Sequence, residues 1–477
     1  MTVQPLEAPS RPLRLSETAG RWVVFATVLG SSVVALDMTV VNVALPALAR
    51  DLSASMAGLQ WIVNAYTLTL AGLILLGGAL GDRFGRRRVF VVGVVWFAVA
   101  SALCGVAQDM TTLVAARALQ GVGGALLTPG SLAIIQASFR PEDRPRAVGA
   151  WSGFGGIAVA VAPLLGGWLV STAGWRWVFF LNLPLAAIAV VVALRYVPES
   201  ADEDATGRFD VLGAVLAAAA LAGITHALTE LPTVLAGGAA GLSGVAGVAA
   251  AVAFVVVERR RTRGHGPRAM LPVDVFGSRQ FIAVNAVTFV VYAGLSVMVF
   301  LLVTNLQVVA GFSPVVAGAA LLPTTVVMLA LSARAGALAQ RIGPRLPMAA
   351  GLVVGAIGMV LVARIGVGAS YFADVLPAVT VFGLGLTATV APLTATALAT
   401  VDGGHAGVAS GVNNAVARAA GLLAVAVVPP AVGLTGHALD DPAAVANGFR
   451  AAMWVSAALL VAGAAITLSA IRADALR

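Results

Sequence analysis

The chain has 477 residues, of which 60% are apolar and only 10% are charged. A soluble globular protein has about 45–50% apolar and about 25% charged residues, so this composition excludes a soluble protein. All 29 basic residues are arginine, against 21 acidic residues, which gives a net charge of +8. The arginines occur in short clusters between apolar runs, and this pattern argues against nucleic acid as a partner.

Several classes of chemistry are also excluded. Cys104 is the only cysteine, so the chain forms neither an internal disulfide nor a cysteine cage for a metal. We find no Walker-type phosphate loop, no zinc-ligand cluster and no Gly-x-Ser-x-Gly elbow. The sequence therefore predicts no cofactor, no metal and no enzyme activity.

Taken in chain order, the apolar runs predict fourteen membrane-spanning helices. A helix that crosses a bilayer needs about 20 mostly apolar residues. The polar segment 1–21 leads into the first run without a small-residue cleavage site, so we interpret that run as an uncleaved span and not as a signal peptide. The expected fold is all-α and integral to the membrane, with spans at 22–44, 59–80, 89–107, 112–138, 147–170, 177–197, 211–231, 233–257, 281–304, 314–333, 348–368, 372–398, 406–430 and 449–471.

The arginines between these spans predict the orientation of the chain. If the N-terminus is cytoplasmic, 23 arginines lie on the cytoplasmic side and four lie outside. Cytoplasmic loops of membrane proteins carry an excess of basic residues. We therefore expect a multi-pass protein of the cytoplasmic membrane with both termini inside, and two arginines, Arg117 and Arg418, within spans.

A repeated segment divides the spans into two sets. The segment Gly78 to Arg87 recurs as Gly336 to Arg345, each time after the second helix of a six-helix set. We expect a cytoplasmic segment at 1–21, an N-terminal bundle at 22–197, a linker with two inserted helices at 198–280, a C-terminal bundle at 281–471 and a cytoplasmic tail at 472–477. Two repeats around a central cavity are the general build of secondary transporters.

Five motifs then occur in order along the first bundle: Leu36 to Pro46, Gly78 to Arg87, Arg117 to Gly124, Pro163 to Gly167 and Gly174 to Trp177. With these motifs the chain resembles the major facilitator superfamily over essentially its whole length, and specifically the fourteen-helix branch of drug:proton antiporters. The resemblance implies a major facilitator fold of two six-helix bundles with two extra helices. It also implies export of small, partly hydrophobic drugs or antibiotics in exchange for protons by alternating access, with the proton gradient as the energy source.

Other functions stay open at this point. A dedicated exporter of one metabolite and a proton-coupled uptake symporter fit the same spans and motifs. A membrane-embedded enzyme would need a cluster of catalytic groups that the spans do not contain. The expected partners are a small-molecule substrate, protons and membrane lipids, and we expect a monomer.

Asp37 and Arg117 are the first candidates for proton coupling. At a rise of about 1.5 Å per residue, both lie in the outer half of the bilayer. A carboxylate there usually pairs, faces a cavity or marks a proton pathway. A structural ion pair and a proton carrier tuned by Arg117 both fit, and the resemblance favours the carrier because similar antiporters use this acid and this arginine in proton coupling. His226 and Glu230 share a predicted helix face, which fits either a solvated helix end or a second titrating site.

Three further polar residues are candidates for the cavity. Arg418 lies near the middle of the bilayer, too deep to reach the surface easily, so it contacts substrate or is satisfied by a structural partner. Asn42 and Gln120 belong to the same motifs as Asp37 and Arg117, and we expect them to line the cavity.

Two glycine-containing motifs predict mechanical roles. An ordinary basic loop explains the arginines after Gly78 but not the acidic residue Asp82 among them. We therefore expect a conformational latch formed by Gly78, Asp82, Arg83, Gly85 and Arg86. Small residues also form one face of the fifth span, which allows close helix packing. The resemblance places this face on the seam between the two bundles, and its residues are Gly149, Gly153, Gly156, Pro163 and Gly167.

Overall fold

The computed structural model describes residues 12–202, 210–263, 277–399 and 406–475. Within these ranges, fourteen helices are long and apolar enough to cross a membrane. The same ranges contain no β-strand, and their one β-bridge joins Leu13 to Phe139. The prediction of an all-α membrane fold is confirmed. Parts of the expected N-terminal segment, of the linker and of the tail lie outside the described residues.

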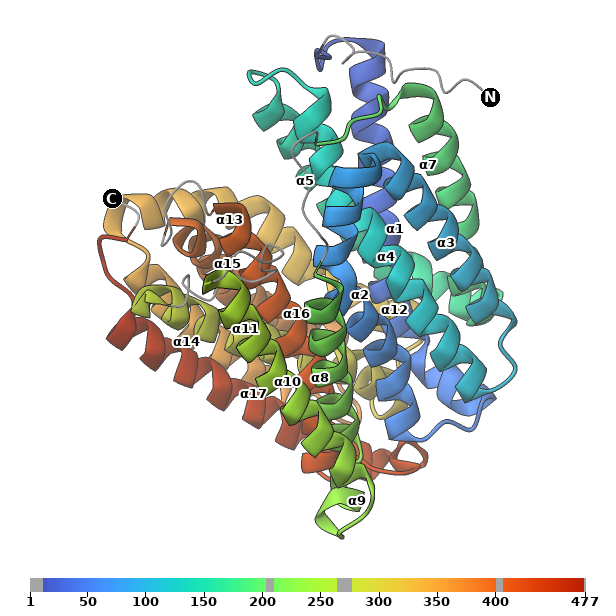
Figure 1. Cartoon of the computed structure of the whole chain (residues 1–477). Coiled ribbons are helices and arrows are strands. Elements are labelled where there is room, and N and C mark those ends of the chain that lie inside the picture. The colour runs from blue at the N-terminus through green and yellow to red at the C-terminus, as the bar shows by residue number, and fades with distance from the viewer. Residues whose placement is uncertain (1–11, 203–209, 264–276, 400–405, 476–477) are drawn as a thin grey trace.

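The helices form two bundles and a separate hairpin (Figure 1). The first bundle contains α1 (Thr18–Asp51), α2 (Met56–Phe84), α3 (Arg86–Val106), α4 (Met110–Ser138), α5 (Arg144–Thr172), α6 (Arg176–Phe180) and α7 (Asn182–Tyr196). The hairpin contains α8 (Val211–Thr229), α9 (Leu231–Leu235) and α10 (Ala240–Arg263). The second bundle contains α11 (Arg279–Val308), α12 (Pro314–Ala319), α13 (Leu322–Ile342), α14 (Arg345–Val362), α15 (Leu376–Ala399), α16 (Ala406–Ala431) and α17 (Pro442–Ala470). A π-helical turn (Tyr371–Val375) leads into α15, and a 3-10 turn (Ala438–Asp440) precedes α17.

Local chemistry sets many of the helix ends. The side chains of Ser55, Asp109 and Ser278 each accept a hydrogen bond from a backbone N–H in the first turn of the helix that follows, which satisfies a group the helix leaves unpaired. Gly85 ends α2 with φ 106° and Gly343 ends α13 with φ 89°. Residues other than glycine rarely adopt this backbone region. The same turn in both copies therefore explains why the repeated segment has glycine at this position.

The spans differ from the expected ones mainly at their ends. Most helices extend beyond the predicted apolar runs, because polar residues near the ends continue the helix. The eighth span was expected at 233–257, but α10 begins at Ala240. Pro232 starts the short helix α9 instead, and Gly237, with φ 79°, turns the chain before α10. The prediction missed this turn because the segment is apolar throughout.

The two bundles meet mainly at one end of the molecule. We call the end where α1 begins and α17 ends the terminal side and the other end the opposite side. Figure 1 shows α5 and α13 separated toward the terminal side, while the bundles converge toward the opposite side. On the terminal side, a Cβ atom added to Gly149 or Gly153 of α5, or to Gly336 of α13, would meet nothing within 4 Å.

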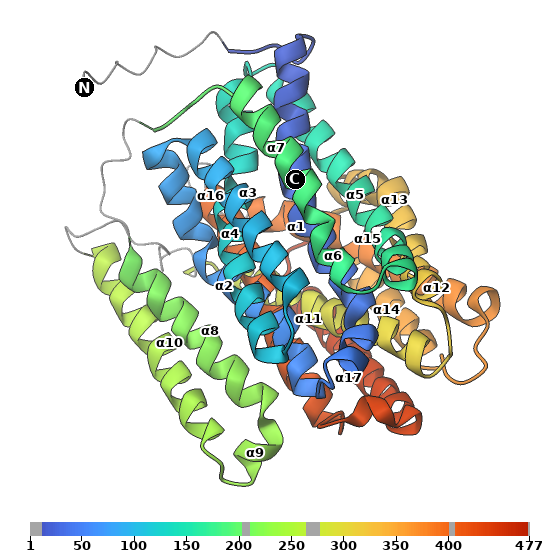
Figure 2. The same cartoon turned by 90° about the vertical axis from the view of Figure 1, so that its right-hand side faces the viewer.

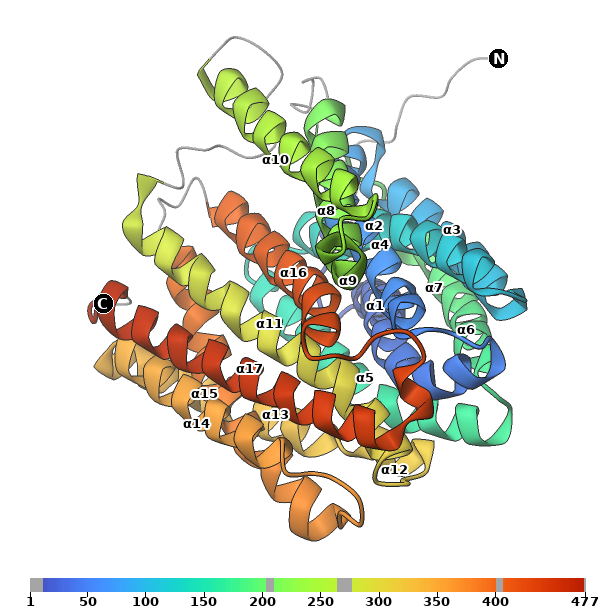
Figure 3. The same cartoon turned by 90° about the horizontal axis from the view of Figure 1, so that it is seen from below.

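The hairpin of α8 and α10 packs along one edge of this assembly. Figure 2 shows the hairpin beside α2, and Figure 3 shows it outside the two bundles. The helix α8 contacts α2 of the first bundle and α16 of the second, and Gly72 of α2 lies against Ala218 of α8. The hairpin therefore covers the seam between α2 and α16 and leaves the seam between α5 and α13 uncovered.

Glycines bring α5 and α12 into close contact on the opposite side. A Cβ atom on Gly318 of α12 would collide with the carbonyl group of Pro163, and one on Gly167 of α5 would collide with the backbone at Pro314. Each glycine thus lies against a proline of the other bundle. Backbones approach this closely only where side chains are absent.

A glutamine on α2 donates to two carbonyl groups of α16 that a pair of prolines leaves without helical donors. Pro429 and Pro430 have no N–H, so the carbonyl groups of Val425 and Ala426 lose their helical donors. The Nε2 atom of Gln60 donates to these two carbonyl oxygens at distances of 2.5 and 3.0 Å. The bond joins the two bundles on the opposite side, and Gln60 is only 1% exposed.

We expect Gln60→Ala to favour separation of the bundles on the opposite side. Two buried carbonyl groups then lack a donor, at a cost of about 1–3 kcal/mol, and water reaches them only when the bundles part. Spin labels at Thr172 and Arg364, in a variant without Cys104, report the distance between the bundles by pulsed electron resonance. The population with a long distance should rise about tenfold.

Thr67→Val is the matched control, because the Thr67 hydroxyl donates only to the Val63 carbonyl of its own helix. Equal distance distributions for Gln60→Ala and Thr67→Val would show that the glutamine does not hold the bundles together.

Candidate functional site

Asp37 and Arg117 form an ion pair inside the first bundle. The Nη1 atom of Arg117 lies 2.5 Å from Oδ2 of Asp37. The other carboxylate oxygen, Oδ1, accepts hydrogen bonds from Nε2 of Gln120 at 2.9 Å and from Nδ2 of Asn182 at 3.0 Å. Each of these four residues is at most 1% exposed. The carboxylate therefore has three donors, and this arrangement fits its ionised form.

Arg117 has further partners around the same point. Its Nε atom donates to the carbonyl oxygen of Ile62 at 3.0 Å, and Nη1 also donates to Oε1 of Gln120 at 2.7 Å. The guanidinium group lies over the ring of Tyr66, 4.3 Å from its centroid, which adds a cation–π attraction. The structure thus brings together three predicted site residues, Asp37, Arg117 and Gln120.

Asn182 and Ser101 complete the cluster, and the sequence reasoning missed both. Asn182 is the first residue of α7, just after the break that separates it from α6. Its Nδ2 atom also donates to Oγ of Ser101 at 3.0 Å, and Ser101 donates to the carbonyl oxygen of Phe179. The amide must point its nitrogen at Asp37, because its oxygen would face a carboxylate. An asparagine inside an apolar run, two residues before Pro184, was the available signal.

Asp37 and Arg117 stabilise each other, and each charge is unfavourable in this environment when its partner is absent. Moving one charged group from water into a protein interior costs several kcal/mol, and this cost is recovered only when a counter-charge and hydrogen bonds are in place. The described cluster supplies both to Asp37 and to Arg117. Protonation of Asp37 would remove the counter-charge and weaken every bond that the carboxylate accepts.

Two buried polar side chains on α2 have no hydrogen-bond partners among the described residues, and one of them, Tyr66, lies over the Arg117 guanidinium group. Asn64 is 1% exposed and Tyr66 is fully buried. Both polar atoms of the Asn64 amide and the hydroxyl of Tyr66 have no partner in the described structure. Asn64 lies one helical turn from Gln60, so this face of α2 presents a row of polar groups toward the second bundle.

Arg418 lies on α16 in the second bundle and is partly buried. Its Nε atom donates to Oδ1 of Asn414 at 2.9 Å, and Tyr66 and Tyr292 lie within electrostatic range of its guanidinium group. Since Tyr66 belongs to the first bundle, Arg418 faces the interface between the bundles. Asn42, by contrast, donates only to the Met38 carbonyl of its own helix.

His226 and Glu230 lie apart from this cluster. Thr229 is the last residue of α8, and the backbone N–H of Glu230, which follows it, donates to the carbonyl oxygen of His226 at 3.0 Å. The ring of His226 lies 6.0 Å from the ring of Trp61 on α2, and the Glu230 carboxylate accepts a bond from Thr233 at 3.4 Å. The His226 contact ties the hairpin to the first bundle, the Glu230 bond lies within the hairpin, and both fit a structural role.

The expected latch residues form a network at the terminal side of the first bundle. Arg86 and Asp82 form an ion pair at 2.8 Å. Arg87 and Arg88 each approach the carboxylate of Glu199 at 3.6 Å, and Glu199 was not predicted. A Cβ atom on Gly85 would lie 2.6 Å from Oε1 of Glu199, and one on Gly78 would lie 3.5 Å from Pro129. Arg83 places its guanidinium over the ring of Phe84. A role as a conformational latch stays a prediction.

The small-residue face of α5 has two different environments. Gly156 lies against Leu329 of α13, and Pro163 and Gly167 pack against α12. Gly149 and Gly153 have no neighbour at the Cβ position. The half of this face on the opposite side is therefore packed against the second bundle, and the half on the terminal side is not.

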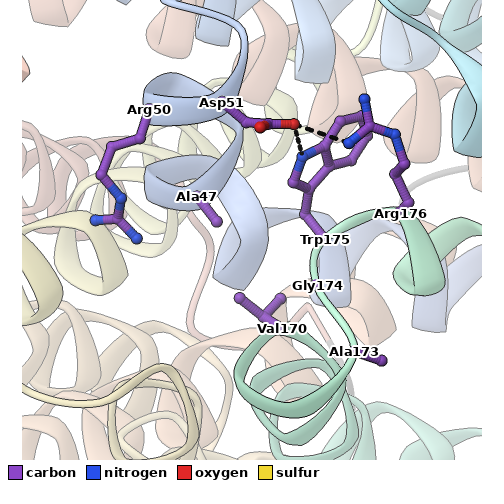
Figure 4. A pocket seen from close by; sticks show the side chains of 8 residues that line it. All are labelled: Ala47, Arg50, Asp51, Val170, Ala173, Gly174, Trp175 and Arg176. Atoms are coloured by element: carbon purple, nitrogen blue, oxygen red, sulfur yellow. Dashed lines mark hydrogen bonds and ion pairs between the residues drawn. The ribbon is translucent and has the colours of Figure 1, made fainter.

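The motif Gly174 to Trp177 forms a clamp on the opposite side of the first bundle (Figure 4). Oδ2 of Asp51 accepts hydrogen bonds from Nε1 of Trp175 and Nη1 of Arg176, each at 2.8 Å. These bonds join the end of α1 to the turn between α5 and α6. The residues line an open pocket of about 450 Å³ together with Arg50, whose side chain points away from the clamp.

Two helical bundles that meet at one end, with an ion pair buried inside one of them, define a membrane transporter of the alternating-access type. The sequence profile of the Major Facilitator Superfamily matches residues 27–211 and 208–426. The chain belongs to this superfamily.

Its relatives include named resistance proteins. The chain is 35% identical over 442 residues to the puromycin resistance protein pur8 of Streptomyces alboniger, which covers 90% of this chain and 86% of that protein. It is 34% identical to the tetracenomycin C resistance and export protein of Streptomyces glaucescens, covering 85% and 74%. It is also 34% identical to the multidrug resistance protein Stp of Mycobacterium tuberculosis, covering 82% and 72%.

Solved structures support the fold. The POT family transporter PepTSo aligns with a TM-score of 0.69 at 16% identity, covering 93% of this chain and 96% of that chain. A D-xylose-proton symporter aligns with a TM-score of 0.65 at 15% identity, covering 96% and 99%. At these identities the likeness concerns the fold alone.

The double variant Asp37→Asn with Arg117→Gln tests whether the cluster is energetically coupled. Arg117→Gln alone leaves a carboxylate buried without a counter-charge, and we expect a loss of about 3–5 kcal/mol in the free energy of unfolding. Adding Asp37→Asn should recover most of this loss, because no charge then remains. Unfolding of the purified protein in detergent measures all three variants.

Arg176→Gln is the control, because the ion pair of Arg176 with Asp51 is exposed and should be worth at most about 1 kcal/mol. A loss in the free energy of unfolding for the double variant that equals the sum of the losses for Arg117→Gln and Asp37→Asn alone would contradict the coupling.

Proposed function

We propose that the protein exports small, partly hydrophobic compounds such as antibiotics across the cytoplasmic membrane in exchange for protons. The observation that carries the proposal is the buried contact of Asp37 with Arg117, Gln120 and Asn182. An acid held away from water by donors that depend on its charge is suited to couple a proton to a structural change. The relatives that carry resistance and export in their names support the choice of substrate.

In this proposal the terminal side faces the cytoplasm. The excess of arginine in the loops on that side supports this orientation, and the arrangement of the bundles then corresponds to an inward-facing state. Substrate enters between the bundles from the cytoplasm. The bundles rock about the central site, close on the terminal side and open on the opposite side, where the contacts made by Gln60 and Gly318 must break.

The proton is exchanged at Asp37 during this cycle. In the inward-facing state Asp37 is ionised and holds Arg117. After the bundles open to the outside, a proton binds the Asp37 carboxylate, the ion pair is lost and substrate is released. Return to the inward-facing state restores the donors around Asp37, and the proton leaves to the cytoplasm. The glycine and arginine network at Asp82 and Arg86 serves as a conformational latch on the terminal side of the first bundle.

The proposal needs no cofactor and no catalytic chemistry, because the proton gradient supplies the energy. The protein works as a monomer within the lipid bilayer, and the basic terminal side contacts anionic lipid headgroups. His226 and Glu230 serve to attach the hairpin and do not carry the coupled proton.

We expect Asp37→Asn to abolish proton-driven export while leaving the protein folded. The amide cannot bind and release a proton, so substrate can no longer be exchanged for one. Everted membrane vesicles measure this: substrate should drive proton release from acidified wild-type vesicles, seen with a pH-sensitive dye, and should have no effect in vesicles that carry the variant. A panel of cationic, neutral and anionic aromatic compounds serves as substrates.

Asp109→Asn is the matched control. Hydrogen bonds from the backbone N–H and the hydroxyl of Thr112 lower the pKa of the Asp109 carboxyl, so this acid stays ionised at neutral pH and does not exchange protons. Full proton-driven transport by Asp37→Asn would contradict the role of Asp37. Accumulation of substrate together with protons, in the same direction, would identify an uptake symporter instead.

A further inference from the structure

Asp37, Arg117 and Arg418 lie within spans, and their charges do not balance. Asp37 and Arg117 neutralise each other at 2.5 Å. Arg418 lies at the middle of α16, and within the described part of the chain no carboxylate lies at ion-pair distance from it. Its hydrogen bond goes to a neutral amide, that of Asn414. The site between the bundles therefore has an excess of one positive charge on Arg418.

The position of Arg418 directs this charge toward the central site. It lies within electrostatic range of Tyr66 of the first bundle and of Tyr292 of α11 in its own bundle. Tyr66 also holds the paired guanidinium of Arg117 over its ring. Tyr66 thus lies close to two guanidinium groups, one with a counter-charge and one without.

An unpaired arginine at this depth is unfavourable without a function. Placing arginine at the centre of a membrane helix costs about 2.5–3.5 kcal/mol. A guanidinium group has five N–H donors in a plane that matches the two oxygens of a carboxylate. Only the Nε donor of Arg418 is used by Asn414, which leaves the outer edge of the guanidinium for a ligand.

We propose that Arg418 binds the acidic group of the transported compound, so that the preferred substrates are aromatic anions or zwitterions. The carboxylate or acidic phenolate would pair with the free edge of the Arg418 guanidinium group, and the aromatic body would lie beside it, near Tyr292 of α11. This inference rests on the proposed function for the direction of transport, but it concerns a binding preference that is measured without transport.

The membrane potential favours the outward movement of an anionic substrate. A cell interior is negative, so each negative charge that moves outward gains about 2.3 kcal/mol per 100 mV. Exchange of an anion for an incoming proton therefore uses both the pH gradient and the membrane potential. A cationic substrate would gain nothing from the potential in a one-for-one exchange.

The test compares two ligands that differ only in charge: anthraquinone-2-carboxylate and its neutral carboxamide. Binding to the purified protein in detergent is measured by calorimetry with no proton gradient. We expect the carboxylate to bind the wild type about tenfold more tightly than the amide, which corresponds to about 1.4 kcal/mol. Arg418→Gln should remove this preference and leave the affinity for the amide unchanged.

Two further variants keep the test decisive. Arg418→Lys retains the charge without the planar edge and should keep part of the preference even if Arg418→Gln folds poorly. Arg334→Gln, which changes an exposed arginine of α13, should keep all of it.

Equal binding of the two ligands by the wild type, no binding of the carboxylate, or an unchanged preference in Arg418→Gln would overturn the inference. A preference that depends on Arg418 in a protein without proton-driven export would instead uphold the inference and refute the proposed function.

Discussion

The ion pair of Asp37 with Arg117 is the interaction on which the first bundle depends. Each group is less favourable in this environment without the other, and the surrounding helices supply donors and exclude water. Gly121 and Gly124 of α4 allow α2 to approach closely enough for Tyr66 to cover the guanidinium. The break between α6 and α7 brings the Asn182 amide to the carboxylate. A change of one proton at Asp37 therefore affects contacts among α1, α4 and α7 at once.

The contacts between the bundles are of a different kind. They consist of backbone groups and small residues: the carbonyl groups freed by Pro429 and Pro430, which Gln60 satisfies, and the glycines that let α5 and α12 touch. Such contacts are specific but contain no charge, so they can be broken and remade without moving an ion out of water. The chain thus keeps its charged pair inside one bundle and uses neutral contacts where the bundles must separate.

The sequence predicted the parts of this arrangement that follow from composition and local pattern. Hydropathy gave the fourteen spans, and the depths of Asp37 and Arg117 indicated that the two could meet, because each charge would be unfavourable alone. The sequence did not predict the contacts of Asn182, Gln60 or Glu199. A single polar residue in or beside an apolar run has no periodicity, and its partner lies far away in the chain. The turn at Gly237 before α10 was missed for a similar reason, since an apolar segment looks continuous whether or not the helix ends.

Arg418 shows both the strength and the limit of such reasoning. Its depth was readable from the sequence, but its lack of a counter-charge became visible only when the neighbouring helices were in place. The balance of charges in the central site therefore depends on the three-dimensional arrangement and not on the count of charged residues in the spans.

Proton release on substrate binding tests the central role of Asp37 most directly. Purified protein in weakly buffered detergent solution is mixed with a transported compound, and a pH indicator records the change. If Asp37 exchanges its proton for substrate, protein equilibrated at a pH where Asp37 is partly protonated should release protons when substrate binds, and Asp37→Asn should bind the compound without releasing any. Equal proton release by the wild type and the variant would contradict the account.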